Sequence, residues 1–354
     1  MGIQKLLPGL KKNVSLKNYT TFKIGGPAKY FFEAKKKEDL IGAVITAKKF
    51  KLPFFILGGG SNILVSDEGF KGLVIKCQMS NVKCQNQNSK LKTIYAESGV
   101  RLSNLVQFSL EKSLAGLEWA VGIPGMVGGA ILGNAGAFGR SMKDVIQKVE
   151  VFDTKTGKVK IFKKKDCQFD YRNSIFKHAN SATLGLRPRG MRMRPCEYPN
   201  LIILSATLQL KKGNKLKIEK RIKEYLNYRK ETQPLNFPSA GSVFKNPKNF
   251  SAGELGEEDK SSSLSTELPK EAKVRKRTKF SCDFAAARLI EECGLKGKRI
   301  GNVKISEKHA NFIVNLGGGK AEDVKKLINL AKKRVKEKFG ITLEEEICYL
   351  GFKN

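Results

Sequence analysis

Residues 57–75 read LGGGSNILVSDEGFKGLVI, and the apolar residues 54–56 lead into them. A short strand is therefore expected to run directly into the glycine-rich turn 58–62. Because glycine has no side chain, the backbone amides of such a turn can approach a pyrophosphate closely. The chain contains no G-x-G-x-x-G and no G-x-x-x-x-G-K-[ST], which excludes the usual Rossmann and P-loop nucleotide sites.

Two further glycine turns lie downstream, GIPG at 122–125 and GNAGA at 133–137. One glycine-rich loop is usually only a turn, whereas three of them near apolar strands are as consistent with a dinucleotide cradle as with separate turns. From these residues alone, a cradle and three simple turns both remain open. The candidate cofactor-binding residues are Gly58, Gly59, Gly60, Ser61, Asn62, Gly122, Ile123, Pro124, Gly125, Gly133, Asn134, Gly136 and Ala137.

The spacing of apolar residues outlines the helices and strands around these turns. Short strands broken by glycine are expected within 19–34 and 53–77, with a helix over 37–50 between them, which is a β-α-β arrangement. The other predicted helices cover 102–113, 216–229, 285–293 and 321–339. The other predicted strands cover 145–152, 158–162, 201–210, 311–316 and 343–350.

The composition indicates a globular protein of two or three domains. The chain has 354 residues, of which 40% are hydrophobic, and 67 Lys and Arg against 33 Asp and Glu give a net charge of +34. Clustered cations would indicate a nucleic-acid partner. Here the lysines are spread along the whole chain without interleaved aromatic residues. This pattern favours a lysine-rich surface and no nucleic-acid partner, and an anionic small substrate would benefit from the same field.

Cysteine, histidine and glycine usage excludes several other classes. The seven Cys include no C-x-x-C pair and only two His exist, so we expect neither a metal site nor a disulfide framework. Residues 119–139 are uncharged but include seven Gly and one Pro, which excludes a membrane-spanning helix there. The N-terminus shows no apolar signal core. We therefore expect a cytoplasmic protein without membrane insertion.

Two segments break the pattern of helices and strands. Residues 183–200 contain four Arg, and residues 249–280 are rich in Ser and charged residues. Both are predicted to be long inserted surface loops. For 183–200, an inert insertion and a functional lid both remain open.

Seven segments form an ordered set that covers most of the chain outside these two loops. They are NYTTFKIGGPA (18–28), LGGGSNILVSDEGFKGLVI (57–75), GLEWAVGIPGMVGGAILGNAGAFG (116–139), FDYRNSIFK (169–177), QPLNFPSAGSVFKNP (233–247), AARLIEECGLKGKRIGNVKISEKHANFIVN (286–315) and LEEEICYLG (343–351). In this order they resemble the UDP-N-acetylenolpyruvoylglucosamine reductase family, flavoenzymes that complete UDP-N-acetylmuramate for peptidoglycan synthesis. The sequence is similar to the shorter of the family's two types, which lacks an extra loop whose tyrosine covers the substrate. Both inserted loops depart from that type.

The resemblance implies an α+β fold. A vanillyl-alcohol-oxidase-like (PCMH-type) FAD-binding domain of two α+β subdomains is expected at 1–212, divided into about 1–78 and 79–212, and a C-terminal α/β substrate domain at 213–354. The resemblance also implies non-covalent FAD as the cofactor and NADPH as a co-substrate. In the implied ping-pong cycle, NADPH reduces the flavin, NADP+ leaves, and the enolpyruvyl substrate enters the same cleft.

The resemblance assigns three catalytic residues whose chemistry suits this reaction. Hydride addition to an enol ether conjugated to a carboxylate leaves negative charge that needs stabilising, and the guanidinium of Arg172 suits a developing enediolate. Ser242, after Gly241, matches the residue that protonates the carbanion carbon. Glu346 matches the acidic residue of the C-terminal strand and would have to be protonated to donate a hydrogen bond. Alternation along a strand would place Glu344 on the same face as Glu346.

The resemblance also implies that Arg229, Lys245 and Asn246 contact the diphosphate, carboxylate and sugar of a UDP-sugar substrate. A monomer or a weak oligomer is expected. One alternative is another flavin oxidase or dehydrogenase of the same superfamily, in which His, Cys or Tyr commonly attaches the flavin. A second alternative, from a different class, is a basic nucleic-acid-binding protein, which would have no visible absorbance.

Overall fold

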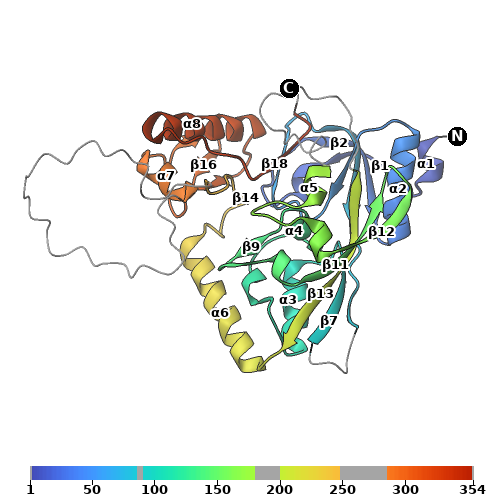
Figure 1. The fold of residues 1–354 in the computed structure, drawn as a ribbon. Coiled ribbons are helices and arrows are strands. Elements are labelled where there is room, and N and C mark those ends of the chain that lie inside the picture. The colour runs from blue at the N-terminus through green and yellow to red at the C-terminus, as the bar shows by residue number, and fades with distance from the viewer. Residues whose placement is uncertain (1, 86–90, 180–199, 248–284, 353–354) are drawn as a thin grey trace, which may run out of the picture.

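The computed structural model describes residues 2–85, 91–179, 200–247 and 285–352. The predicted surface loop 249–280 and all of the predicted loop 183–200 except Asn200 lie outside the described residues. Among the described residues, no helix has both the length and the apolar character needed to cross a membrane. Two sheets with their helices and a smaller C-terminal unit make up the molecule (Figure 1).

The first sheet contains the predicted β-α-β arrangement. Its strand order is β1 (Lys11–Ser15), β2 (Pro27–Ala34), β5 (Phe70–Cys77) and β3 (Phe54–Leu57), and β5 pairs in parallel with both β2 and β3. Helix α2 (Lys37–Lys49) connects β2 to β3. Its buried residues recur with helical spacing and join the core beneath the sheet. They include Leu40, Ala43, Val44 and Ala47.

The second sheet is antiparallel. Its order is β12 (Lys158–Lys163), β11 (Ile146–Asp153), β13 (Leu201–Lys212), β7 (Leu91–Glu97) and β6 (Val82–Cys84). The predicted strands 145–152, 158–162 and 201–210 are confirmed. Helices α3 (Leu102–Glu111), α4 (Val127–Leu132) and α5 (Ile175–Ala179) contribute to the same hydrophobic core as β7, β11 and β13. Trp119 is fully buried in this core.

The C-terminal unit contains the helices and the central strand that apolar spacing predicts. Helix α6 (Lys215–Thr232) leads to a sheet of order β14 (Ser239–Ser242), β17 (Phe312–Asn315), β16 (Val303–Ile305) and β15 (Arg299–Ile300). Helices α7 (Ala286–Glu292) and α8 (Ala321–Phe339) pack with that sheet (Figure 1). However, Ile218 and Ile222 of α6 are buried in the core of the second sheet, so this helix packs with the preceding unit.

The chain end differs from prediction. Only β18 (Cys348–Leu350) is a strand, instead of the predicted 343–350, and it pairs in parallel with β4 (Ile63–Val65), which directly follows the first glycine turn. Before it, Glu345 makes an isolated bridge to Phe244. The run 343–347 is not a continuous strand because it crosses from the C-terminal unit to the first one. That crossing carries Glu346 to the glycine turn.

The remaining elements are short. They are the helix α1 (Ile3–Leu6), the strands β8 (Leu114–Ala115), β9 (Gly136–Ala137) and β10 (Arg140–Ser141), and the 3-10 helices at Leu16–Tyr19, Glu118–Ala120, Met142–Asp144 and Lys164–Cys167.

Candidate active site

The first glycine turn, 58–62, requires glycine for steric reasons. A Cβ on Gly59 would lie 2.9 Å from the Cα of Gly125, and Gly60 has φ +63° with the carbonyl oxygen of Tyr19 in the way of a Cβ. The amide of Thr21 donates to the carbonyl of Gly60 at 3.0 Å. The backbone of the turn is therefore held close to its neighbours, and side chains are kept out of it.

The second glycine turn, 122–125, lies against the first. The hydroxyl of Ser61 donates to the carbonyl of Pro124 at 2.9 Å, and Gly125 has φ +134°. Within the described residues, the amides of Gly59, Gly60, Ser61 and Gly125 have no hydrogen-bond acceptor. Adjacent unpaired amides in a side-chain-free cradle suit an anionic pyrophosphate. These two turns therefore fit a dinucleotide such as FAD.

We expect Gly59→Ala to weaken FAD binding about ten- to a hundredfold, because the backbone of the second turn would have to shift and such overpacking costs about 1–3 kcal/mol. The measurement is the dissociation constant for FAD, obtained by adding FAD to the apoprotein and following flavin fluorescence. Gly42→Ala is the control, since its Cβ would meet nothing within 4 Å. Equal affinity of Gly59→Ala and wild type would contradict the assignment of this turn.

The third glycine turn, 133–137, contacts the segment that carries Arg172. Asn134 adopts φ 42°, its side-chain amide donates to the carbonyl of Asp170 at 2.8 Å, and its Oδ1 accepts from the amide of Lys143 at 3.0 Å. The carbonyl of Gly136 accepts from Nη1 of Arg172 at 3.1 Å. In this structure the contacts of the third turn thus orient the segment 170–172.

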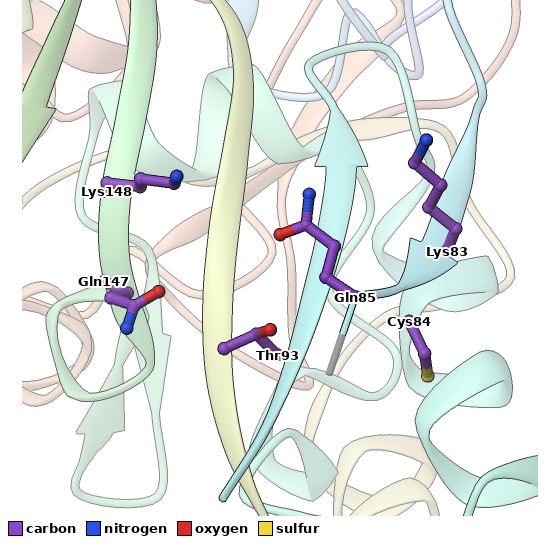
Figure 2. A pocket seen from close by; sticks show the side chains of 6 residues that line it. All are labelled: Lys83, Cys84, Gln85, Thr93, Gln147 and Lys148. Atoms are coloured by element: carbon purple, nitrogen blue, oxygen red, sulfur yellow. The ribbon is translucent and has the colours of Figure 1, made fainter. Parts of the chain in front are cut away.

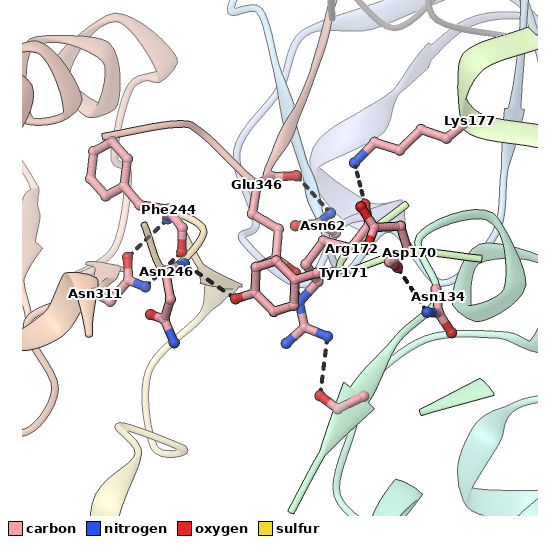
Figure 3. Close-up of polar contacts among 11 residues, drawn as sticks. Asn62, Asn134, Asp170, Tyr171, Arg172, Lys177, Phe244, Asn246, Asn311 and Glu346 are labelled. Carbon is pink, nitrogen blue, oxygen red and sulfur yellow. Dashed lines mark hydrogen bonds and ion pairs between the residues drawn. The ribbon is translucent and has the colours of Figure 1, made fainter. Parts of the chain in front are cut away.

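Arg172 and Glu346 form an ion pair at the centre of these contacts (Figure 3). Nε of Arg172 lies 2.8 Å from Oε1 of Glu346, and both side chains are about one-fifth exposed, at 24% and 19%. The contact counts as an ion pair only, and Nε is buried with no hydrogen-bond partner among the described residues. The pair therefore leaves donor capacity of the guanidinium unused.

The backbone of Glu346 connects the glycine turn to the C-terminal unit. Its carbonyl accepts from the side-chain amide of Asn62 at 3.1 Å, and its amide donates to the carbonyl of Val243 at 2.7 Å. Ser242, the half-buried last residue of β14, directly precedes Val243. A Cβ on Gly241 would lie 4.0 Å from the carbonyl oxygen of Ser61. The three predicted catalytic residues, which are distant in sequence, thus belong to segments joined around one glycine turn.

Arg229 brings a second, more deeply buried guanidinium to the site. The residue is 7% exposed, its Cδ would lie 2.8 Å from a Cβ on Gly122, and its guanidinium lies over the ring of Phe138, 5.3 Å from the centroid. Burial, followed by the charge of Arg172, lowers the pKa of Arg229, but a guanidinium stays charged in proteins. Its Nε has no hydrogen-bond partner among the described residues, which suits an anionic ligand.

Lys245 and Asn246 extend the site on the C-terminal side. Nζ of Lys245 pairs with Oε2 of Glu344 at 3.0 Å. The amide of Asn246 donates to the hydroxyl of Tyr171 at 3.2 Å (Figure 3). Oδ1 of Asn246 accepts from the amide of Ala286 at 3.1 Å. Strand alternation was expected to place Glu344 on the same face as Glu346. It does not apply, because Glu344 lies outside the strand β18.

Sequence reasoning passed over two residues of the site. Tyr171 holds the segment of Asn246 through its hydroxyl, and Nζ of Lys177 donates to the carbonyl of Arg172 at 3.2 Å (Figure 3). Both belong to the segment FDYRNSIFK (169–177), which was singled out for Arg172 alone. The sequence could have pointed to both residues, because they lie in the same segment as Arg172.

An open pocket of about 520 Å³ lies elsewhere, over strands β6, β7 and β11 (Figure 2). Its lining residues are Lys83, Cys84, Gln85, Thr93, Gln147 and Lys148. None of them contributes to the contacts around Arg172, so this pocket is not the candidate active site.

Comparison with known proteins identifies the family. The family model for the C-terminal domain of UDP-N-acetylenolpyruvoylglucosamine reductase matches residues 233–350, and the model for an FAD-binding domain matches residues 28–163. The chain is 37% identical to the UDP-N-acetylenolpyruvoylglucosamine reductase of Caldanaerobacter subterraneus, over 96% of this chain and 93% of that protein. It belongs to the UDP-N-acetylenolpyruvoylglucosamine reductase family. The predicted family and the FAD-binding fold are thereby confirmed.

Other members of the UDP-N-acetylenolpyruvoylglucosamine reductase family support the assignment. The protein of that name from Caldicellulosiruptor bescii is 39% identical over 96% of this chain and 90% of its own length. The crystal structure of UDP-N-acetylenolpyruvylglucosamine reductase from Thermus caldophilus superposes with a TM-score of 0.68 at 31% identity, covering 96% of this chain and 99% of that one. The likeness therefore extends over both units of the fold.

Proposed function

We propose that this protein uses bound FAD and NADPH to reduce UDP-N-acetyl-3-O-(1-carboxyvinyl)-glucosamine to UDP-N-acetylmuramate, a precursor of peptidoglycan. The observation that carries the proposal is the ion pair of Arg172 with Glu346 beside a glycine turn whose amides have no acceptor in the described part of the chain. A cationic site next to a dinucleotide cradle suits a substrate that is an anionic nucleotide sugar. Family membership supports the same reaction.

In the proposed site, each residue would have a separate role in the reaction. The hydride for the vinyl carbon of the substrate would come from FAD bound at the first two glycine turns. Arg172 would stabilise the negative charge that develops on the neighbouring carbon and carboxylate, and Ser242 would donate a proton to that carbon. Glu346 is the counter-ion of Arg172 in this structure. We infer that the substrate carboxylate displaces it, so that Glu346 can take up a proton and donate a hydrogen bond to the intermediate.

Substrate binding would use the cations around this centre. Arg229 is buried, and its Nε has no partner among the residues that the structure describes. Lys245 lies with Asn246 on the C-terminal side, so we assign these three to the diphosphate, carboxylate and sugar. The first two glycine turns would hold FAD, and the third would orient Arg172. We propose a cytoplasmic enzyme, because NADPH and UDP-sugars are made there, acting as a monomer or a weak oligomer.

The proposal is tested by anaerobic and aerobic turnover of the UDP-enolpyruvyl sugar with NADPH. We expect a yellow protein whose flavin separates from the polypeptide on denaturation, and NADPH consumption that depends on the sugar. Flavin that stays attached, or oxidation of an alcohol with oxygen instead, would favour an oxidase of the same superfamily. A colourless folded protein that cannot be reconstituted with FAD would contradict the proposal.

A further inference from the structure

Beyond the residues assigned above, the half-buried Lys177 contacts the catalytic segment without a role in the proposed chemistry. We propose that Lys177 is a positioning residue, whose ammonium holds the backbone of Arg172 so that the guanidinium meets the developing charge. This inference rests on the proposed function and adds to it a residue that acts through Arg172.

The backbone of Arg172 needs such support. Arg172 has φ +52°, a left-handed conformation that residues with a side chain adopt at a cost. The flanking residues Asp170 and Asn173 exchange two backbone hydrogen bonds of 3.1 Å, which close a tight turn around it. The carbonyl of Arg172 takes no part in that exchange and instead accepts from Nζ of Lys177 at 3.2 Å. Lys177 is therefore placed to keep the turn in the conformation that aims Arg172.

Lys177 itself is fixed from the protein core. It belongs to the short helix α5, where Phe176 is fully buried and packs edge-on against Phe162 at 5.5 Å. At the start of α5, the hydroxyl of Ser174 donates to the carbonyl of Leu132 at 2.7 Å. The amide of Lys177 donates to the carbonyl of Ser174 at 3.0 Å. The helix thus connects the rigid core of the second sheet to Arg172.

The charges around Lys177 agree with a hydrogen-bonding role. Burial lowers the pKa of its ammonium, and Lys245 and Arg172 lower it further, whereas Cys348 and Glu346 raise it. Placing an ammonium among two other cations is unfavourable unless it donates to a fixed acceptor. The carbonyl of Arg172 is that acceptor. A misplacement of a catalytic group by about 1 Å can cost about a hundredfold in rate.

The test separates the two half-reactions by stopped-flow absorbance of the flavin. We expect Lys177→Met to leave reduction by NADPH near wild type and to slow reoxidation by the UDP-enolpyruvyl sugar about ten- to a hundredfold. Lys177→Arg keeps donors and charge and should lie closer to wild type. Lys48→Met is the matched control, because Nζ of Lys48 also donates to a backbone carbonyl, that of Thr154, away from the site.

A double-mutant cycle decides whether Lys177 acts through Arg172. In an Arg172→Lys background, Lys177→Met should slow reoxidation by less than about twofold. Multiplicative effects, equal slowing of both half-reactions, or wild-type reoxidation in Lys177→Met would each overturn the inference. If Lys177→Met does not retain FAD, Lys177→Gln takes its place in the cycle with the same criteria. An inactive wild type would instead count against the proposed function.

Discussion

Ser242→Ala should leave reduction of the flavin by NADPH near the wild-type rate and slow its reoxidation by substrate about 10²- to 10⁴-fold. Reduction by NADPH needs only hydride transfer to the flavin and does not require a proton donor to the substrate carbon. Reoxidation needs that proton, and the loss of a positioned general acid typically costs this much in rate. Ser242 ends β14 directly before Val243, whose carbonyl holds the amide of Glu346. The alanine variant should therefore keep the local backbone.

Stopped-flow absorbance separates the two steps. Mixing with NADPH follows loss of the yellow colour, and mixing the reduced enzyme anaerobically with substrate follows its return. Ser103→Ala is the control, since Ser103 is exposed on α3 and its hydroxyl donates to the side chain of the neighbouring Asn104. If Ser242→Ala regains its colour as fast as wild type and forms the same product, the proton comes from another residue or from water.

Local sequence patterns were sufficient for most individual elements. The spacing of Leu40, Ala43 and Val44 predicts helix α2 because helical periodicity decides which face is buried. The glycine turn 58–62 was visible because an apolar strand leads into consecutive glycines. The structure adds the reason why position 59 needs glycine: a Cβ on this residue would lie 2.9 Å from the Cα of Gly125. That contact joins residues far apart in sequence, so no local pattern contains it.

Two features of the site depend on tertiary contacts and could not be predicted locally. The run 343–350 has the composition of a strand end, yet only 348–350 forms β18, because the run first bridges to Phe244 in the C-terminal unit at Glu345 and then crosses to pair with β4. The predicted domain division at 212/213 stays a prediction. Helix α6 follows that point, but its apolar face packs into the core of the second sheet. Periodicity identifies a buried face without identifying its partner.

The second large effect is expected at Arg172. Removing a donor that stabilises developing negative charge typically costs about 10²- to 10³-fold, so Arg172→Met should slow reoxidation by substrate to that extent. Arg172→Lys should slow reoxidation less than Arg172→Met does, because lysine keeps a positive charge. It should still be slower than wild type, because lysine lacks the planar fork that reaches both Gly136 and Glu346.

The variants should fold, since the turn around Arg172 is closed by the two backbone hydrogen bonds between Asp170 and Asn173, which the substitutions do not remove. Melting temperature and FAD content check this, and reduction by NADPH should stay near wild type. Arg221→Met, on the exposed face of α6, is the matched control and should alter neither half-reaction. If Arg172→Met instead weakens substrate binding while the rate of reoxidation at saturation is unchanged, Arg172 binds the ground state and does not stabilise the transition state. Charge stabilisation would then have to come from Arg229 or Lys245.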